Sequence, residues 1–137
     1  MPTVTSPRPP LNLFNVARLN VQSFFTTILD VPDYLIPANG PNPARTVSAV
    51  ALLTSLVVSN NSNDTIQLSI QVTDSNDATW LILNQMDIPA NDFAVIEFGK
   101  QNLPSGDRLE LRTNNFQGAV AALSYVLNQR EEFVVIT

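Results

Sequence analysis

Two pairs of carboxylates are the residues of this chain whose spacing suggests catalysis. Asp74 and Asp77 share a short polar segment, and Asp92 and Glu97 lie five positions apart. A glycoside-cleaving enzyme needs two carboxylates that face one cleft. Neither pair is accompanied by a base or a nucleophile, and the chain has no His and no Cys. We therefore predict a non-enzymatic protein without catalytic residues, and the carboxylate pair remains the least favoured alternative.

The same polar segment offers oxygen ligands for a calcium ion at Asp74, Asn76 and Asp77. Their spacing differs from that of an EF-hand loop, which favours a plain turn. The four glycines stand singly, so the chain has no glycine-rich phosphate loop. We expect no metal and no cofactor.

The charge balance argues against nucleic acid as a partner. The formal net charge is -5, and the basic residues are scattered, whereas phosphate recognition uses clustered Lys and Arg. The longest apolar-rich run, 47–58, is shorter than the roughly 20 residues that a membrane-spanning helix needs. The first ten residues also lack the apolar centre of a signal peptide. We expect no membrane association.

Charged residues make up only 14% of the chain, against about 25% in an average protein. The surface must therefore be covered mainly by Asn, Gln, Ser and Thr. Interface cores are depleted in charge, so this composition favours a subunit of an assembly. A neutral, soluble monomer is the alternative.

Residues 64–74 form the clearest secondary-structure signal. Apolar residues at 66, 68, 70 and 72 alternate with polar ones, which predicts a strand with one buried face. The other face carries Gln67, Ser69 and Gln71 and no charge. These three residues are candidate assembly contacts.

The neighbouring segments predict further strands. Residues 47–59 are nearly continuous in Val, Ala and Leu, which indicates a central strand buried on both faces. Residues 79–84 complete a hairpin with 64–74. We expect Trp80 and the phenylalanines to fill the core; the alternative is that Trp80 and Tyr34 stack on sugar rings.

Two similar turns follow the hairpin, at 88–93 and 103–108. Each reads apolar, Pro, small, Asn or Gly, and Asp. Proline is expected at the first central turn position, and Asn91 or Gly106 at the position with positive φ. Two such turns in series predict a meander.

About eight short strands separated by polar turns predict an all-β protein, a single antiparallel β-sandwich with jelly-roll or immunoglobulin-like connectivity. Strands are also expected within 11–22, with a possible bulge, and at 24–31, 93–98, 108–113 and 119–127, and a long loop at 33–44. The domain boundaries are an extended arm at 1–10, the sandwich at 11–130, and a tail or edge strand at 131–137.

Both ends carry candidate assembly contacts. The proline-rich arm contains Pro7, Pro9 and Pro10, and proline reduces the entropy lost when a segment docks. The tail contains Phe133 and Val135, which suit an added edge strand. An end without fixed structure is the alternative for the arm.

The order of these features resembles small β-sandwich virion structural proteins of tailed bacteriophages. The resemblance runs from Leu13 to Gln129 and is carried by the segments 15–19, 24–28, 56–60, 64–83, 88–92, 106–111 and 121–127. The arm, the 33–44 segment and the tail depart from that pattern.

The resemblance implies a structural subunit in the tail, neck or baseplate of a virion, assembled in the host cytoplasm. Its partners would be other virion proteins and copies of itself, as a homo-oligomer within the assembly. The alternatives are a capsid decoration or cement protein that bridges capsomers, and a carbohydrate- or receptor-binding module.

Overall fold

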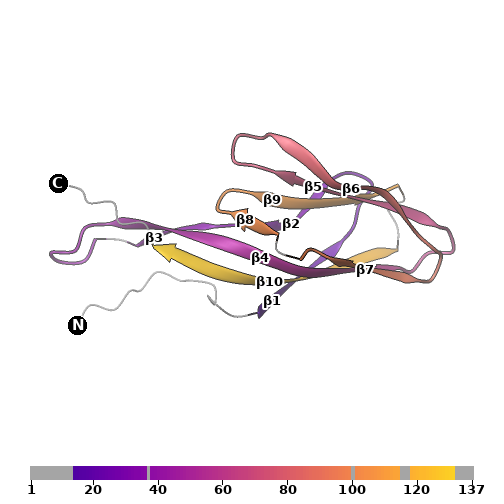
Figure 1. Cartoon of the computed structure of the whole chain (residues 1–137), viewed down its shortest axis with the longest axis horizontal. Helices are drawn as coiled ribbons and strands as arrows, with labels where there is room; N and C mark the ends of the chain where they lie inside the picture. Colours follow the sequence, from indigo (N-terminus) through magenta and orange to yellow (C-terminus); the bar gives the residue numbers. More distant parts are fainter. Residues whose placement is uncertain (1–13, 37, 100, 115–117, 132–137) are drawn as a thin grey trace.

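A computed structural model describes residues 14–36, 38–99, 101–114 and 118–131, without the side chains of 34–36, 45–47 and 129–131. The described chain is all β and forms two antiparallel sheets packed as a sandwich, as predicted (Figure 1). The strands are β1 (Phe14–Asn20), β2 (Thr26–Asp30), β3 (Asp33–Ile36), β4 (Arg45–Asn60), β5 (Ile66–Thr73), β6 (Thr79–Ile88), β7 (Phe93–Glu97), β8 (Asn102–Pro104), β9 (Arg108–Thr113) and β10 (Ala119–Glu131).

The strand order distinguishes the two predicted connectivities. One sheet, here sheet A, has the order β1-β10-β4. On the side of β4 opposite β10, three short strands pair with successive parts of β4, namely β3, then β8, then β7. The other, sheet B, has the order β2-β9-β5-β6. The first strand thus pairs with the last, β2 with β9, β4 with β7 and β8, and β5 with β6. A long hairpin rolled up in this way is a jelly roll.

The core between the sheets is aliphatic. The inward residues of β5, which are Ile66, Leu68, Ile70 and Val72, are completely buried, as their alternation predicts. Complete burial of one such side chain stabilises the fold by about 1.5–3 kcal/mol. Leucines and small residues of β4 and β10 face them across the sandwich, and Leu109 and Leu111 of β9 lie beside them in the same sheet. Small residues on β10, such as Ala121, let the two sheets approach closely.

Trp80 and the phenylalanines that the structure describes do not fill this core, so that prediction is wrong for them. Trp80 is 45% exposed, because β6 is the edge strand of sheet B and the side of the sandwich is open there. Phe14, Phe24 and Phe93 are exposed as well. Among the described phenylalanines and tyrosines, Phe98 and Tyr125 pack against the core at its margin.

The strand β4 is central in its sheet, as predicted, but only one of its faces is buried. Its inward residues, including Leu53 and Leu56, have no exposed surface. Val57, on the opposite face, is 36% exposed, and nothing in the described chain covers it. Because β4 and β5 lie in different sheets, they do not form a hairpin with each other.

The two proline turns differ from the prediction in two ways. The backbone bonds Asp92 N to Pro89 O (3.2 Å) and Asp107 N to Pro104 O (3.1 Å) place each proline at the first residue of its turn, before the central pair. Positive φ does occur at Asn91 and at Gly106, as expected. The turns also connect β6 to β7 and β8 to β9, which are in opposite sheets, so they are crossovers and not steps of a meander.

Residues 33–44 are not an irregular loop. β3 pairs with the start of β4, and Asn39 bridges Asn42 at the tip of the hairpin. Figure 1 shows this hairpin extending well beyond the sandwich at the left of the view. Its described tip residues, from Ala38 to Pro43, are exposed.

In β1 the register with β10 is continuous from Phe14 to Asn20, so the bulge that the sequence allows within 11–22 does not occur there.

Candidate functional site

The polar face predicted on β5 lies on the outer side of sheet B and makes intramolecular bonds. Gln71 Nε2 donates to Glu110 Oε1 at 3.1 Å, and Thr73 Oγ1 donates to the same oxygen. Gln67 and Gln71 are half-buried, whereas Ser69 is only 2% exposed. Of the three candidate contacts on β5, the two glutamines are therefore accessible to a partner, and Ser69 has a role inside the fold.

That role is set by an irregularity in β6. The β5–β6 register shifts around Ser69, and Gln85 opposite it has a φ of 53°. The shift removes the Gln85 amide from the regular ladder, and this amide donates to Ser69 Oγ at 3.1 Å. Because this bond is part-buried, loss of the acceptor should cost towards the lower end of the roughly 1–3 kcal/mol that an unpaired buried amide costs. The serine hydroxyl thus satisfies the backbone at a β-bulge.

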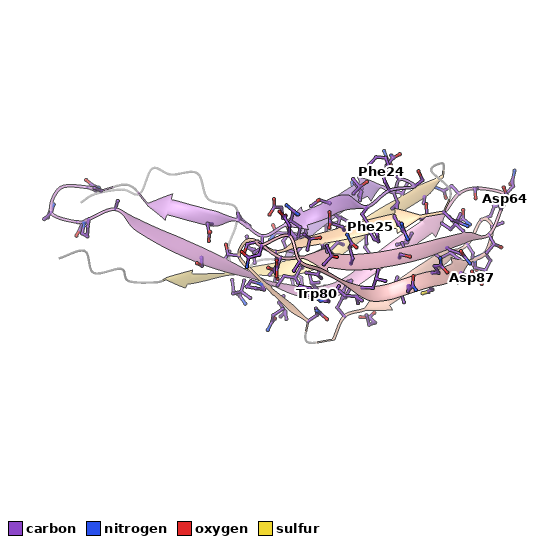
Figure 2. The ribbon with its side chains drawn as sticks, turned by 90° about the horizontal axis from the view of Figure 1, so that it is seen from above. Phe24, Phe25, Asp64, Trp80 and Asp87 are labelled. Atoms are coloured by element: carbon purple, nitrogen blue, oxygen red, sulfur yellow. The ribbon has the colours of Figure 1, made fainter. Side chains whose placement is uncertain are left out.

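A shallow concavity of about 230 Å³ lies beside these residues. Arg112 stands at its edge, with its guanidinium carbon 4.6 Å from the centre of the Phe25 ring. Figure 2 shows Phe25 next to the more exposed Phe24. The lining is polar and consists of Ser23, Gln67, Ser69, Gln85, Arg112, Thr113 and Asn114. Such a surface can donate hydrogen bonds to a polar partner.

One carboxylate of each pair in the sequence binds backbone amides of its own turn. Asp74 Oδ1 accepts bonds from the amides of Asn76 (2.8 Å) and Ala78 (3.0 Å), which is the geometry of an Asx turn. Asp92 Oδ1 accepts the amide of Phe93 at 2.8 Å. Within the described residues, no group of three or more acidic, His or Cys side chains could hold a metal ion.

Five of the candidate contacts lie outside the described residues. These are Pro7, Pro9 and Pro10 of the arm, and Phe133 and Val135 of the tail.

A larger candidate interface lies on the opposite side of the molecule, on the outer side of sheet A. We call this surface the outer A face. The cross-strand register places its side chains in rows. Each row runs over β1, β10 and β4 and ends on β7 or β8. The rows are Asn20–Val120–Ser59–Phe93, Arg18–Ala122–Val57–Val95, Val16–Ser124–Ser55–Glu97 and Phe14–Val126–Leu52–Asn102.

Most of these side chains are apolar, and several are strongly exposed. Phe14 is 76% exposed and Phe93 61%, at diagonally opposite corners of the face. Among the described side chains in these rows, only Arg18 and Glu97 are charged, and both lie on edge strands. Contiguous exposed apolar patches on soluble proteins mark contact sites. An exposed apolar surface of this kind can bind another protein, and Glu97 is the one carboxylate among the described side chains of these rows.

Sequence reasoning did not assign this face, although its signal was present. The run 47–59 indicated burial on both sides, and the structure buries one side. The second apolar side of β4, with Val57 at its centre, is therefore available for a partner. Phe93 and Val95 of β7 extend the same surface.

Comparison with protein-family models, with curated proteins and with solved structures finds no match for this chain. The described residues contain no helix long and apolar enough to cross a bilayer.

Proposed function

We propose that the chain is a non-enzymatic structural subunit of a tailed-phage virion, a component of the tail, neck or baseplate that acts through protein–protein contacts. The observation that carries this proposal is the outer A face. An uncharged strip of Val, Ala and Ser, with Val57 at its centre and exposed phenylalanines at two corners, loses its contact with water when a second protein covers it.

Two further features support an assembly role. The β3–β4 hairpin projects from the sandwich, which gives the subunit a long, narrow extension that can reach a neighbour (Figure 1). The jelly-roll connectivity is a common architecture of viral capsid domains, although a fold alone does not determine function. The resemblance of the sequence to small virion proteins points in the same direction.

Mass spectrometry of purified particles tests this proposal. Heads and tails separated from one preparation are digested, and peptides of this chain are quantified in each fraction. We expect the peptides in the tail fraction at a ratio to the major tail protein that is constant between preparations. Peptides that remain with the soluble host proteins and never co-purify with particles would contradict the proposal.

A capsid decoration or cement protein is the close alternative. The projecting β3–β4 hairpin favours it, because an extension of this kind can bridge two capsomers. The same experiment separates the two roles, since a cement protein would be recovered with the heads.

A carbohydrate- or receptor-binding module is the second alternative. It is favoured by Trp80, which is 45% exposed and next to the exposed Leu81 on an edge strand. Figure 2 shows Trp80 about midway along the molecule. An exposed tryptophan offers an apolar face on which a sugar ring can stack. A glycan array without hits would remove this alternative.

A further inference from the structure

We infer that the outer A face pairs with the same face of a second copy of this chain, about a two-fold axis that runs parallel to the strands between the two sheets. This inference rests on the proposed assembly role and names the partner of the outer A face. An interface of this kind is isologous, so every contact occurs twice.

The charges on the face are self-complementary under this symmetry. Arg18 lies on β1 at one edge of the sheet, and Glu97 lies on β7 at the other. A two-fold axis along the strands places β1 of one copy opposite β7 of the other. The register puts Arg18 and Glu97 in adjacent rows, a step of about 7 Å along the strand, which the long arginine side chain can span. Two Arg18–Glu97 pairs would therefore flank the interface.

The sizes of the side chains match as well. The same rotation places β4 over β10, so that Val57 faces Ala122 and Leu52 faces Val126. The two large corner residues meet short polar ones, because Phe93 is placed over Asn20, and Phe14 over Asn102. Large residues thus face small or short ones at about half of the facing positions, which favours close packing there.

The area is sufficient for a stable dimer. Four strands at about 4.8 Å spacing and about nine residues at 3.4 Å each give a footprint of roughly 600 Å² per copy, or about 1,200 Å² for both. Specific interfaces bury more than about 1,000 Å² in total. The net charge of -5 opposes association only weakly here, because among the described side chains in these rows Glu97 is the one acidic group.

A charge-swap experiment tests the pairing. The full chain and the variants Arg18→Glu, Glu97→Arg and the double swap are compared by analytical ultracentrifugation at micromolar concentration. We expect a wild-type dimer, a dissociation constant raised about tenfold or more in each single variant, and restoration to within a few-fold in the double variant. Both residues are exposed, so folding should be retained, and urea unfolding of each variant verifies this. Asp87→Arg, an equally exposed change on sheet B, is the matched control and should leave the dimer unchanged.

Two outcomes would overturn the inference. One is a wild-type chain that stays monomeric at micromolar concentration, and the other is a dimer that neither single swap weakens. Neither outcome bears on the proposed function. That function is tested separately, by whether the chain is present in purified particles. A monomer found in tails would mean that another virion protein covers the outer A face.

Discussion

The side-chain amide of Asn60 joins the two sheets by donating from Nδ2 to the backbone carbonyl of Ile88 at 3.1 Å. Asn60 ends β4 in sheet A, and Ile88 ends β6 in sheet B. The same nitrogen also donates to Asp64 O (2.8 Å) and Pro89 O (3.0 Å), while Oδ1 accepts from the amide of Ser62. Asn60 is only 1% exposed, and its bond to the Ile88 carbonyl is buried, whereas the bonds to Asp64 and Pro89 are part-buried.

Replacement of Asn60 by Ala should therefore destabilise the fold by roughly 2–4 kcal/mol, because one buried and three part-buried backbone groups lose a partner. Urea unfolding followed by circular dichroism measures this change. Asn63→Ala is the matched control, since this exposed asparagine in the same turn makes only a long bond of 3.5 Å to Asn91. Equal effects of the two substitutions would show that Asn60 does not link the sheets.

The bulge in β6 predicts a smaller effect at Ser69. Ser69→Ala leaves the Gln85 amide without the acceptor that it now has, and we expect a loss of about 1–2 kcal/mol in the free energy of unfolding. Hydrogen exchange at the Gln85 amide should accelerate by more than exchange at amides elsewhere in sheet B. Ser23→Ala, at an exposed position on the rim of the same concavity, should change neither quantity.

The two crossover turns predict a difference between substitutions at equivalent positions. Gly106 has a φ of +89°, and an added Cβ would lie 3.0 Å from the Ser75 Cβ. Gly106→Ala should therefore cost roughly 1–3 kcal/mol. Asn91→Gly, at a φ of 55°, removes a side chain from a position that glycine adopts without strain, so its cost should stay below about 0.5 kcal/mol. Thermal denaturation of both variants measures the contrast, and a Gly106→Ala variant as stable as the wild type would contradict it.

Local patterns predicted the strands well because period-two alternation reports directly on burial, as in β5. They did not predict which strands share a sheet. The similar turns at 88–93 and 103–108 have the residues of any tight turn, and the choice between a hairpin and a crossover depends on where the following strand finds a partner. That partner is β4, far away in the sequence, for both β7 and β8.

The candidate site was predicted only in part for a related reason. Alternation identifies a polar face, but Ser69 on that face is buried by a bulge that its own segment does not encode. The outer A face combines residues from five strands that are separate in the sequence, so no single window shows it. The alternation along 79–84 predicts a core position for Trp80, whereas the edge position of β6 leaves it exposed.

The buried aspartate in the second crossover predicts a pH dependence of stability. Asp107 is 7% exposed, and its pKa is raised from 3.8, first by burial and then by the nearby Asp74. A raised carboxyl pKa means that the folded chain binds the proton more tightly than the unfolded chain. The ionised Asp107 therefore destabilises the fold at pH values above its pKa in the folded chain. This destabilisation disappears as the pH falls towards 3.8, the ordinary pKa of the group. Asp107→Asn should therefore gain more stability relative to wild type at pH 7 than at pH 4. Urea unfolding at both pH values measures the difference, and an effect that is equal at both would contradict the prediction.

Lysine substitutions on the β5 face and on the outer A face should distinguish the roles of these two surfaces. Gln67→Lys combined with Gln71→Lys should fold normally, because both positions are half-buried at the surface and Glu110 lies beside position 71 to pair with the new ammonium group. We expect this variant to dimerise like the wild type but to enter particles poorly, if the polar face of β5 contacts another virion protein.

Val57→Lys places a charge at the centre of the outer A face, which should abolish both dimerisation and incorporation, since an unpaired charge in an apolar interface is strongly unfavourable. Ultracentrifugation and quantitative mass spectrometry of particles measure the two effects. Normal incorporation of the double-lysine variant would show that the β5 face is only solvated, and normal dimerisation of Val57→Lys would show that the outer A face is not the dimer interface.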